Sequence, residues 1–165
     1  MRGLLIVATF LFSLTAKADD WGPLQFLVGQ WTGEGGGEPG QGSGSFSFTP
    51  DLQGKILVRK NVAEYPPSKE KPAYRHDDLM VIYRDGPSRQ IRAIYFDSEE
   101  HTIEYSIQPV DDGVVFVSRS PQDAPRFRLT YARAGSERLK LKLKFEIAPP
   151  GKDFATYIEA VARRL

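Results

Sequence analysis

One segment near the end of the chain alternates strictly between basic and apolar side chains: residues 138–145 read Arg-Leu-Lys-Leu-Lys-Leu-Lys-Phe. Successive side chains of a β-strand point to opposite faces, so this pattern predicts a strand with one buried and one solvated face. Other short segments with apolar alternation follow one another along the chain, separated by residues typical of turns. This spacing predicts an all-β protein built as a single antiparallel meander.

The turn residues divide the chain into a short helical turn over 23–29, a series of expected strands and one ambiguous segment. The expected strands cover 27–37, 43–49, 55–65, 74–84, 90–97, 102–108, 114–118, 125–133 and 137–147. The last segment, 154–165, fits either a helix capped by Asp153 or a further strand. A long meander hides its edges most efficiently by closing on itself, so we predict a barrel of roughly ten strands. A two-sheet sandwich is the competing architecture.

The first 18 residues have the three-part layout of a secretory signal peptide. Met1 and Arg2 give a positive start, residues 3–15 are almost entirely apolar, and Ala16-Lys17-Ala18 is a small-x-small cleavage site. The apolar run is shorter than the roughly 20 residues of a membrane-spanning helix. A buried N-terminal strand is the other alternative. We predict cleavage after Ala18, one barrel domain over 19–165, and a periplasmic or secreted location.

Composition excludes several classes of function. Because two of the 22 basic residues, Arg2 and Lys17, lie in the leader, the remaining chain carries 20 basic and 21 acidic residues. This balance lacks the basic excess expected of a nucleic-acid-binding protein. The chain has no cysteine, which excludes disulfides, thiol catalysis and zinc–thiolate sites. The fold must therefore be stabilised by core packing alone.

The segment 29–40 is rich in glycine. Gly35, Gly37 and Gly40 match the spacing G-x-G-x-x-G, but Pro39 and a Gly/Ser-rich stretch follow where a dinucleotide site requires a helix. We therefore reject a nucleotide site. Glycines in a strand permit sharp curvature or the close approach of a ligand to the backbone.

The candidate ligand-binding residues of this segment are Trp31, Gly33 and Gly35. The alternative for Trp31, which we favour, is a core aromatic that seals one end of the barrel.

The opening segment also carries a family resemblance. Phe26-Leu27-Val28-Gly29-Gln30-Trp31-Thr32-Gly33-Glu34-Gly35 resembles the first strand of nitrobindin-like barrels and related exported bacterial domains of calycin type. Tyr65-Pro66-Pro67 and His76-Asp77-Asp78-Leu79 resemble members of the same group. The resemblance implies a calycin-like barrel of about ten strands, with the architecture of fatty-acid-binding proteins and an apolar pocket.

The same resemblance raises heme as a possible cofactor, because nitrobindins hold heme through a histidine on a late strand. This chain departs from that pattern, since no histidine follows His101. His76 and Tyr157 are the remaining candidates for an axial ligand. Heme binding is therefore the alternative function, and no cofactor is our main expectation.

Polar residues within the expected strands give the remaining candidate ligand-binding positions. Arg59 and Asn61 share one strand face, His76 and Asp78 share another, and Tyr95 lies on a third strand. A buried arginine in a barrel meets an anionic head group or a structural carboxylate. For Arg59 we favour an outward orientation.

The two histidines have both a chemical and a structural interpretation. His76 with Asp78 could bind a metal or act as a general base, but one strand face supplies only two ligands, and we favour an exposed histidine at a strand start. His101 lies in an expected hairpin turn with Glu99 and Glu100. We favour a solvated turn there over transient metal contact, and predict no metal site.

The chain has no nucleophile motif of the types Gly-x-Ser-x-Gly, Ser-x-x-Lys or His-Glu-x-x-His, and we assign no catalytic residue. The main prediction is an exported barrel that binds a small apolar or amphipathic molecule. The alternatives are heme binding, an enzyme that uses His76 and Asp78, and an envelope interaction module that uses a stripe of Lys140, Lys142 and Lys144. For the lysine stripe we favour a solvated face that resists edge pairing.

Overall fold

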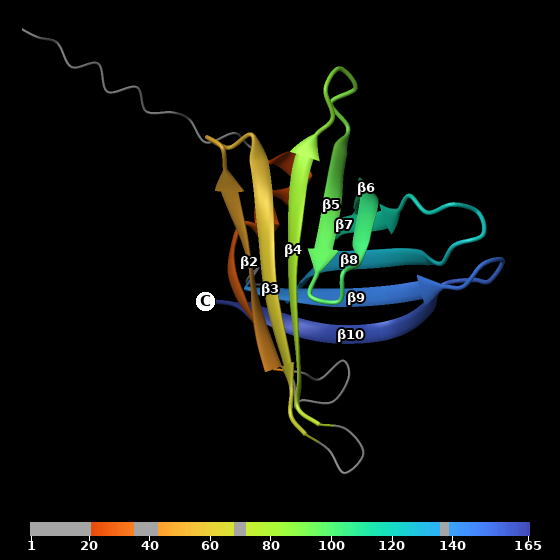
Figure 1. Ribbon diagram of the computed structural model, residues 1–165. Coiled ribbons are helices and arrows are strands. Elements are labelled where there is room, and N and C mark those ends of the chain that lie inside the picture. Colours follow the sequence, from red (N-terminus) through yellow and green to blue (C-terminus); the bar gives the residue numbers. More distant parts are fainter. Residues whose placement is uncertain (1–20, 35–42, 68–71, 136–138) are drawn as a thin grey trace, which may run out of the picture.

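The computed structural model describes residues 21–34, 43–67, 72–135 and 139–165, and these form a closed antiparallel barrel (Figure 1). The strands neighbour one another in chain order, and the barrel closes where the first strand pairs with the last. The predicted all-β meander, its closure into a barrel of ten strands and the N-terminal helical turn are confirmed. The proposed leader, 1–18, lies outside the described residues.

A 3-10 helix, η1 (Gly22–Leu27), precedes the strands. The strands are β1 (Gly29–Glu34), β2 (Ser43–Asp51), β3 (Ile56–Tyr65), β4 (Tyr74–Arg84), β5 (Ile91–Asp97), β6 (Thr102–Val110), β7 (Gly113–Ser118), β8 (Arg126–Ala134), β9 (Lys140–Ala148) and β10 (Ala155–Arg164). Within the described part of the chain, no helix is long and apolar enough to cross a membrane.

The ambiguous C-terminal segment is a strand. Its pairing with β9 shifts register between Thr156 and Ile158, which marks a β-bulge at Tyr157. The extra residue interrupts the two-residue alternation, and this explains why the apolar spacing resembles that of a helix. As a strand, the segment covers edges of both β1 and β9.

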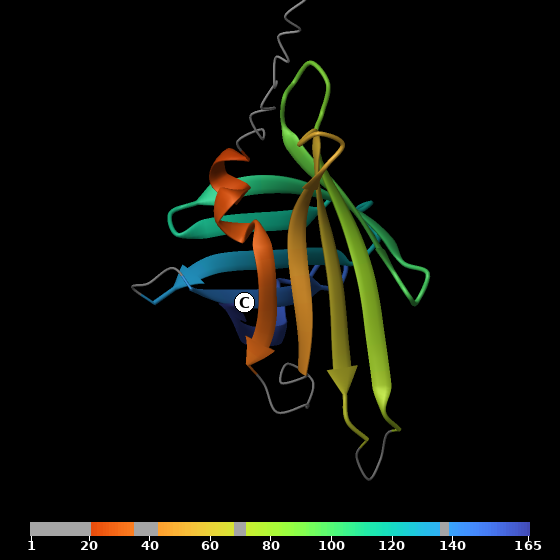
Figure 2. The same cartoon turned by 90° about the vertical axis from the view of Figure 1, so that its left-hand side faces the viewer.

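The first strand starts two residues later than predicted, because Leu27 belongs to η1. The guanidinium of Arg164 on β10 donates to the carbonyls of Val28, at 2.8 Å, and Phe26, at 2.9 Å. The indole Nε1 of Trp31 donates to the carbonyl of Leu27 at 2.8 Å. These bonds hold η1 over one end of the barrel, where it packs against β7 (Figure 2).

Aromatic side chains pack together inside the barrel. Trp31 stacks on Phe46 with 6.2 Å between ring centroids, and Tyr131 packs edge-on against both Phe48, at 5.5 Å, and Phe116, at 5.9 Å. All five side chains are at least nine-tenths buried. Trp31 is thus the core aromatic that we favoured over a ligand-lining residue.

The outer face of β9 is charged but not strongly basic. Lys140, Lys142 and Lys144 each form an ion pair with a glutamate: Lys140 with Glu34 of β1 at 3.2 Å, Lys142 with Glu159 of β10 at 2.6 Å, and Lys144 with Glu146 of β9 at 3.0 Å. The predicted alternation of a wet and a buried face is clearest in the middle of the segment, where buried Leu141 lies between exposed Lys140 and Lys142, whereas Leu139 is 49% exposed. The paired glutamates offset the positive charge that an anionic partner would need.

Gly113 is expected to tolerate no side chain. A Cβ atom at this position would meet the carbonyl oxygen of Tyr131 and lie 2.8 Å from Cα of Ala132, both in the backbone of β8. Gly113→Ala should lower the free energy of unfolding by about 2–3 kcal/mol, since β7 and β8 must move apart. Gly86→Ala is the control, because a Cβ there meets nothing within 4 Å. Equal urea midpoints for the two variants would contradict this prediction.

Glu146 is expected to make stability depend on acid pH. Its carboxylate accepts from Arg128 at 2.6 Å, and this hydrogen bond, helped by Lys144 and opposed by burial, lowers its pKa to about 2. Because the pKa of Glu146 is lower in the folded than in the unfolded state, its ionised carboxylate stabilises the fold at pH values above the unfolded-state pKa of 4.5. This stabilisation is lost as the pH falls toward 2. Glu146→Gln should cost about 2 kcal/mol at pH 7.

The measurement is urea unfolding of the wild type and Glu146→Gln between pH 7 and 2. The stability difference should shrink below pH 4.5. Glu159→Gln, which removes a carboxylate that is 45% exposed, is the control and should show a smaller difference. A Glu146→Gln effect that is constant across this pH range would refute the assignment.

Candidate functional site

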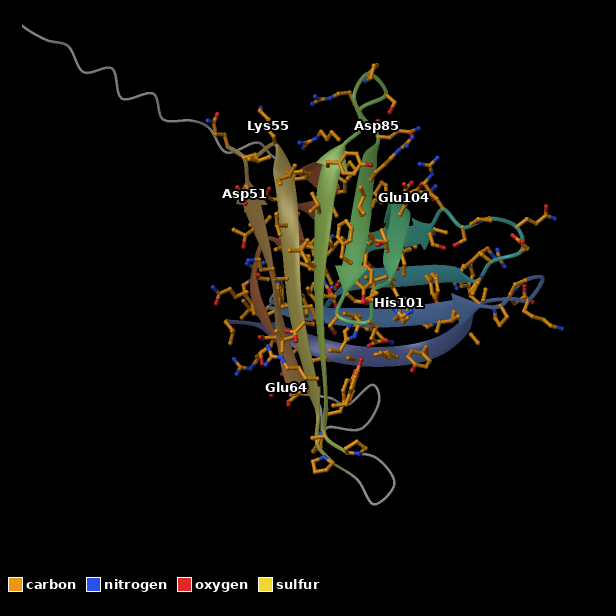
Figure 3. The ribbon with its side chains drawn as sticks, in the orientation of Figure 1. Asp51, Lys55, Glu64, Asp85, His101 and Glu104 are labelled. Atoms are coloured by element: carbon orange, nitrogen blue, oxygen red, sulfur yellow. The ribbon has the colours of Figure 1, made fainter. Side chains whose placement is uncertain are left out.

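A polar network lies on the inner faces of β3, β4 and β5, at the end of the barrel away from η1. The strand register places Asn61 beside Asp78 and Asp78 beside Asp97, so inward-facing polar residues of three strands form one row. Figure 3 shows Asp85 at one end of the β4–β5 pair and His101 toward the other end. The polar network lies at the end of the β4–β5 pair that is near His101.

Arg59 and Asp78 form a buried ion pair in the centre of this network. Their side chains are 6% and 5% exposed, and the amide of Asn61 donates to the second oxygen of Asp78 at 2.9 Å. Burial opposes the charge on Arg59, but the Asp78 carboxylate, together with the hydroxyls of Tyr131 and Tyr95, raises the pKa of the guanidinium. The outward orientation that we favoured for Arg59 is wrong, because an inward carboxylate on the neighbouring strand compensates its charge.

Two buried donors beside this pair have no hydrogen-bond partner among the described residues: Nε of Arg59 and the hydroxyl of Tyr131. The two groups do contact each other: a weak hydrogen-bond interaction with the Tyr131 hydroxyl adds to the raised pKa of Arg59, although its geometry is too poor to satisfy either donor. Burial raises the pKa of Tyr131 to about 12, so its O–H group stays a neutral donor. A buried donor without an acceptor costs about 1–3 kcal/mol.

His76 connects the buried pair to the surface. Its Nδ1 lies 2.9 Å from Oε1 of Glu99, and its Nε2 lies 3.1 Å from the hydroxyl of Tyr95 and 3.5 Å from Oδ2 of Asp78. The Asp78 carboxylate raises the pKa of His76, with burial opposing and Asp97 adding to the shift. The side chain is 22% exposed, so it is more enclosed than the strand-start histidine that we favoured.

Asp97 joins the β5–β6 turn to the network. Its Oδ1 accepts from the backbone N–H groups of Glu99, at 3.0 Å, and His101, at 2.9 Å. Its Oδ2 accepts from the hydroxyl of Tyr95 at 3.2 Å and lies 2.9 Å from Nδ1 of His101. Burial opposes the ionisation of Asp97, but these His101 and Glu99 contacts lower its pKa.

Aromatic rings lie at the same end of the barrel. Phe145 of β9 packs on Phe127 of β8, at 6.1 Å, and on Tyr157 of β10, at 6.2 Å. Tyr65 of β3 stacks on Tyr74 of β4 at 6.0 Å. Burial raises the pKa of Tyr65, and Tyr157 is close enough to add to the shift. The two aromatic sets therefore approach each other beside the polar network.

The structure brings together five of the predicted site residues and places two others elsewhere, and the eighth lies outside the described residues. The five are Arg59, Asn61, His76, Asp78 and Tyr95. Trp31 lies in the aromatic core, Gly33 lies on β1 beside Ala162 of β10, and Gly35 lies outside the described residues. Our candidates omitted Tyr74, Asp97, Glu99, His101 and Tyr131.

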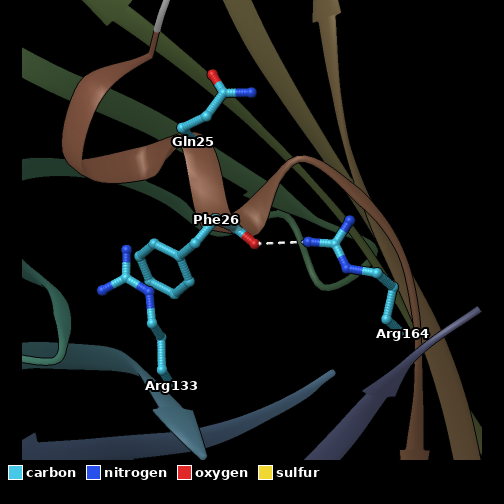
Figure 4. A pocket seen from close by; sticks show the side chains of 4 residues that line it. All are labelled: Gln25, Phe26, Arg133 and Arg164. Atoms are coloured by element: carbon cyan, nitrogen blue, oxygen red, sulfur yellow. Dashed lines mark hydrogen bonds between the residues drawn. The ribbon is translucent and has the colours of Figure 1, made fainter. Parts of the chain in front are cut away.

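A hollow of about 260 Å³ lies at the opposite end of the barrel, lined by Gln25, Phe26, Arg133 and Arg164 (Figure 4). The guanidinium of Arg164 is occupied by the carbonyls of η1, and that of Arg133 stacks on the ring of Phe26 at 4.1 Å. The histidines and carboxylates of the polar network lie at the other end of the barrel. A third donor without a partner among the described residues, Nε1 of Trp21, lies at the η1 end, but we place the candidate site at the polar network, because two neighbouring unpartnered donors lie there beside a buried ion pair.

Comparison with known proteins adds no assignment: no protein-family model matches the chain, and no curated protein is significantly similar to it.

The buried ion pair yields a test by double substitution. Arg59→Met leaves Asp78 charged and unpaired, and should lower the free energy of unfolding by about 3–5 kcal/mol. Adding Asp78→Asn removes the uncompensated charge and should recover part of this loss. The measurement is urea unfolding of both variants at pH 7. If the double variant is no more stable than Arg59→Met, Asp78 is not the partner that keeps Arg59 inside the barrel.

Proposed function

We propose that the protein is an exported barrel that binds a small amphipathic molecule, and that an oxygen atom of this molecule accepts hydrogen bonds from Arg59 and Tyr131. The observation that carries the proposal is the pair of unpartnered, fully buried donors on β3 and β8. Buried polar groups in folded proteins are nearly always hydrogen-bonded. Two neighbouring exceptions therefore indicate an acceptor supplied from outside the chain.

The charge balance around these donors favours a neutral or weakly charged acceptor. Asp78 already neutralises Arg59, so a carbonyl or hydroxyl oxygen would bind without bringing an uncompensated charge into the barrel. The Nε–H of Arg59 and the O–H of Tyr131 would both donate to it. Each of these bonds removes a desolvation cost that the free protein bears.

The apolar part of the ligand would contact the aromatic rings of the network end. Tyr95 packs against Tyr105 at 6.4 Å, and Tyr105 packs against Phe116 at 6.3 Å, so aromatic surface continues from the network toward Tyr131. Phe127 and Phe145 are only partly buried and lie against this core. A ligand with an oxygen-bearing head for the buried donors and a short apolar tail for the aromatic rings would match this arrangement.

A nitrobindin-like origin remains part of this proposal for the barrel, but the described residues do not fit heme. Both ring nitrogens of His76 are engaged, by Glu99 and by Tyr95 and Asp78, and Tyr157 is 63% exposed. Trp31 and the neighbouring aromatics occupy the interior that a porphyrin would need. The envelope-module alternative is also weak, because the lysine stripe is paired with glutamates.

If the barrel is exported, its ligand would come from the cell envelope or the medium, because a periplasmic or secreted protein meets molecules there. The leader over 1–18 supports this step. The intact mass of the protein recovered from its own cells tests it, with a chain that starts at Asp19 as the expected result.

Tyr131→Phe tests the proposed acceptor contact. The substitution keeps the ring and removes only the unpartnered hydroxyl, so the stability of the free protein should be unchanged or rise by up to about 1 kcal/mol. Affinity for 1-decanol, used as a neutral amphipathic probe with an oxygen head group, should fall about tenfold, as expected for one lost hydrogen bond. Isothermal titration calorimetry measures the affinity, and native mass spectrometry of the purified protein tests for a co-purified ligand.

Tyr83→Phe is the matched control, because Tyr83 faces outward on β4 and its hydroxyl should not affect binding. Equal 1-decanol affinities for the wild type and both variants would rule out the Tyr131 contact. A wild type that binds no 1-decanol and carries no co-purified molecule would argue against the ligand-binding function itself.

A further inference from the structure

The chain contains only two histidines, and both lie in the polar network beside the carboxylates of the β5–β6 turn. We propose that His76, Asp97, Glu99 and His101 form a binding site for a divalent transition-metal ion, with Zn²⁺ as the best match. This inference concerns the outer part of the network and does not depend on the proposed ligand at Arg59 and Tyr131.

The donor atoms are already gathered. His76, Asp97 and Glu99 each offer one ligand atom, and these three atoms lie within 4.8 Å of one another. Nδ1 of His76 is 2.9 Å from Oε1 of Glu99, while Nδ1 of His101 is 2.9 Å from Oδ2 of Asp97 and 4.0 Å from Oε2 of Glu99. Donors bonded to a tetrahedral Zn²⁺ at about 2.0–2.1 Å lie about 3.3 Å apart. The observed donor–donor distances of 2.9 and 4.0 Å lie on either side of this value.

The four side chains divide into two fixed and two adjustable ligands. Asp97 is 5% exposed and His76 is 22% exposed, so the surrounding barrel holds them in place. Glu99 and His101 are 44% and 61% exposed and can rotate without disturbing the core. Small rotations of these two would therefore close the set around an ion.

Groups outside the four ligands orient their donor atoms. Asp97 uses Oδ1 to accept the backbone N–H groups of the turn, which leaves Oδ2 directed toward His101. Nε2 of His76 faces the hydroxyl of Tyr95 and the carboxylate of Asp78. A proton on Nε2 leaves the lone pair of Nδ1 for the ion, which is the carboxylate–histidine arrangement common around bound metals.

Charge also favours a cation. Asp97 and Glu99 bring two negative charges, and the nearest described guanidinium of the network, that of Arg59, is paired with Asp78. A dication would balance the two turn carboxylates. Two imidazoles with two carboxylates form a mixed nitrogen and oxygen set, which suits Zn²⁺ and similar first-row ions better than Ca²⁺ or Mg²⁺.

The two histidines allow a direct test by NMR on the full, tag-free chain after treatment with EDTA. The imidazole ¹⁵N spectrum should contain two ring systems, and adding one equivalent of Zn²⁺ should shift the Nδ1 signals of both. Signals that stay unchanged in several-fold excess of Zn²⁺ would overturn the proposal and leave a hydrogen-bonded histidine–carboxylate network.

Substitutions test the ligand set independently. His101→Gln changes an exposed side chain and should fold normally, yet weaken Co²⁺ or Zn²⁺ binding at least about tenfold. The histidine-free variant His76→Gln/His101→Gln should lose the visible absorption of bound Co²⁺. Glu64→Gln is the control, because this exposed carboxylate of β3 pairs with Arg75 outside the set. Wild-type affinity in either histidine variant would overturn the assignment.

Discussion

Closure of the sheet between β1 and β10 is the constraint on which the rest of this molecule depends. The last residues seal it: the backbone N–H of Leu165 donates to the carbonyl of Gln30 at 2.9 Å, and the side chain of Arg164 clamps η1 over the end. Among the strands that the structure describes, closure leaves no edge open to other chains. It also encloses an interior of limited size, in which every polar side chain must find a partner or bear a cost.

The two ends of this limited interior are occupied by different kinds of side chain. Toward η1, large aromatic side chains fill it, as the stacking of Trp31 on Phe46 shows. Toward the other end, the inward positions of β3–β5 are polar, and Asp78 is the group that makes this possible, since it contacts Arg59, Asn61 and His76. The network is nearly satisfied internally, so its few unpartnered donors become the chemically significant feature.

The fold was largely predictable from the sequence, because alternation of period two reports strands directly. The alternation over 138–145 identified β9, whereas the bulge at Tyr157 left 154–165 ambiguous between a helix and a strand. The candidate site was less predictable. The prediction that Arg59 and Asn61 share one strand face, and His76 and Asp78 another, was correct. Which face points into the barrel, however, depends on how neighbouring strands pair. One sequence does not reveal that register, so the inward Arg59 and the meeting of both histidines were missed.

The most direct test of the ligand-binding account is a high-resolution crystal structure of the protein purified from its own cells without added ligand. The account predicts electron density for a small molecule with an oxygen atom within hydrogen-bond distance of both Nε of Arg59 and the hydroxyl of Tyr131. Density that shows these two groups bonded to each other, or to a single ordered water with packed side chains around it, would contradict the account.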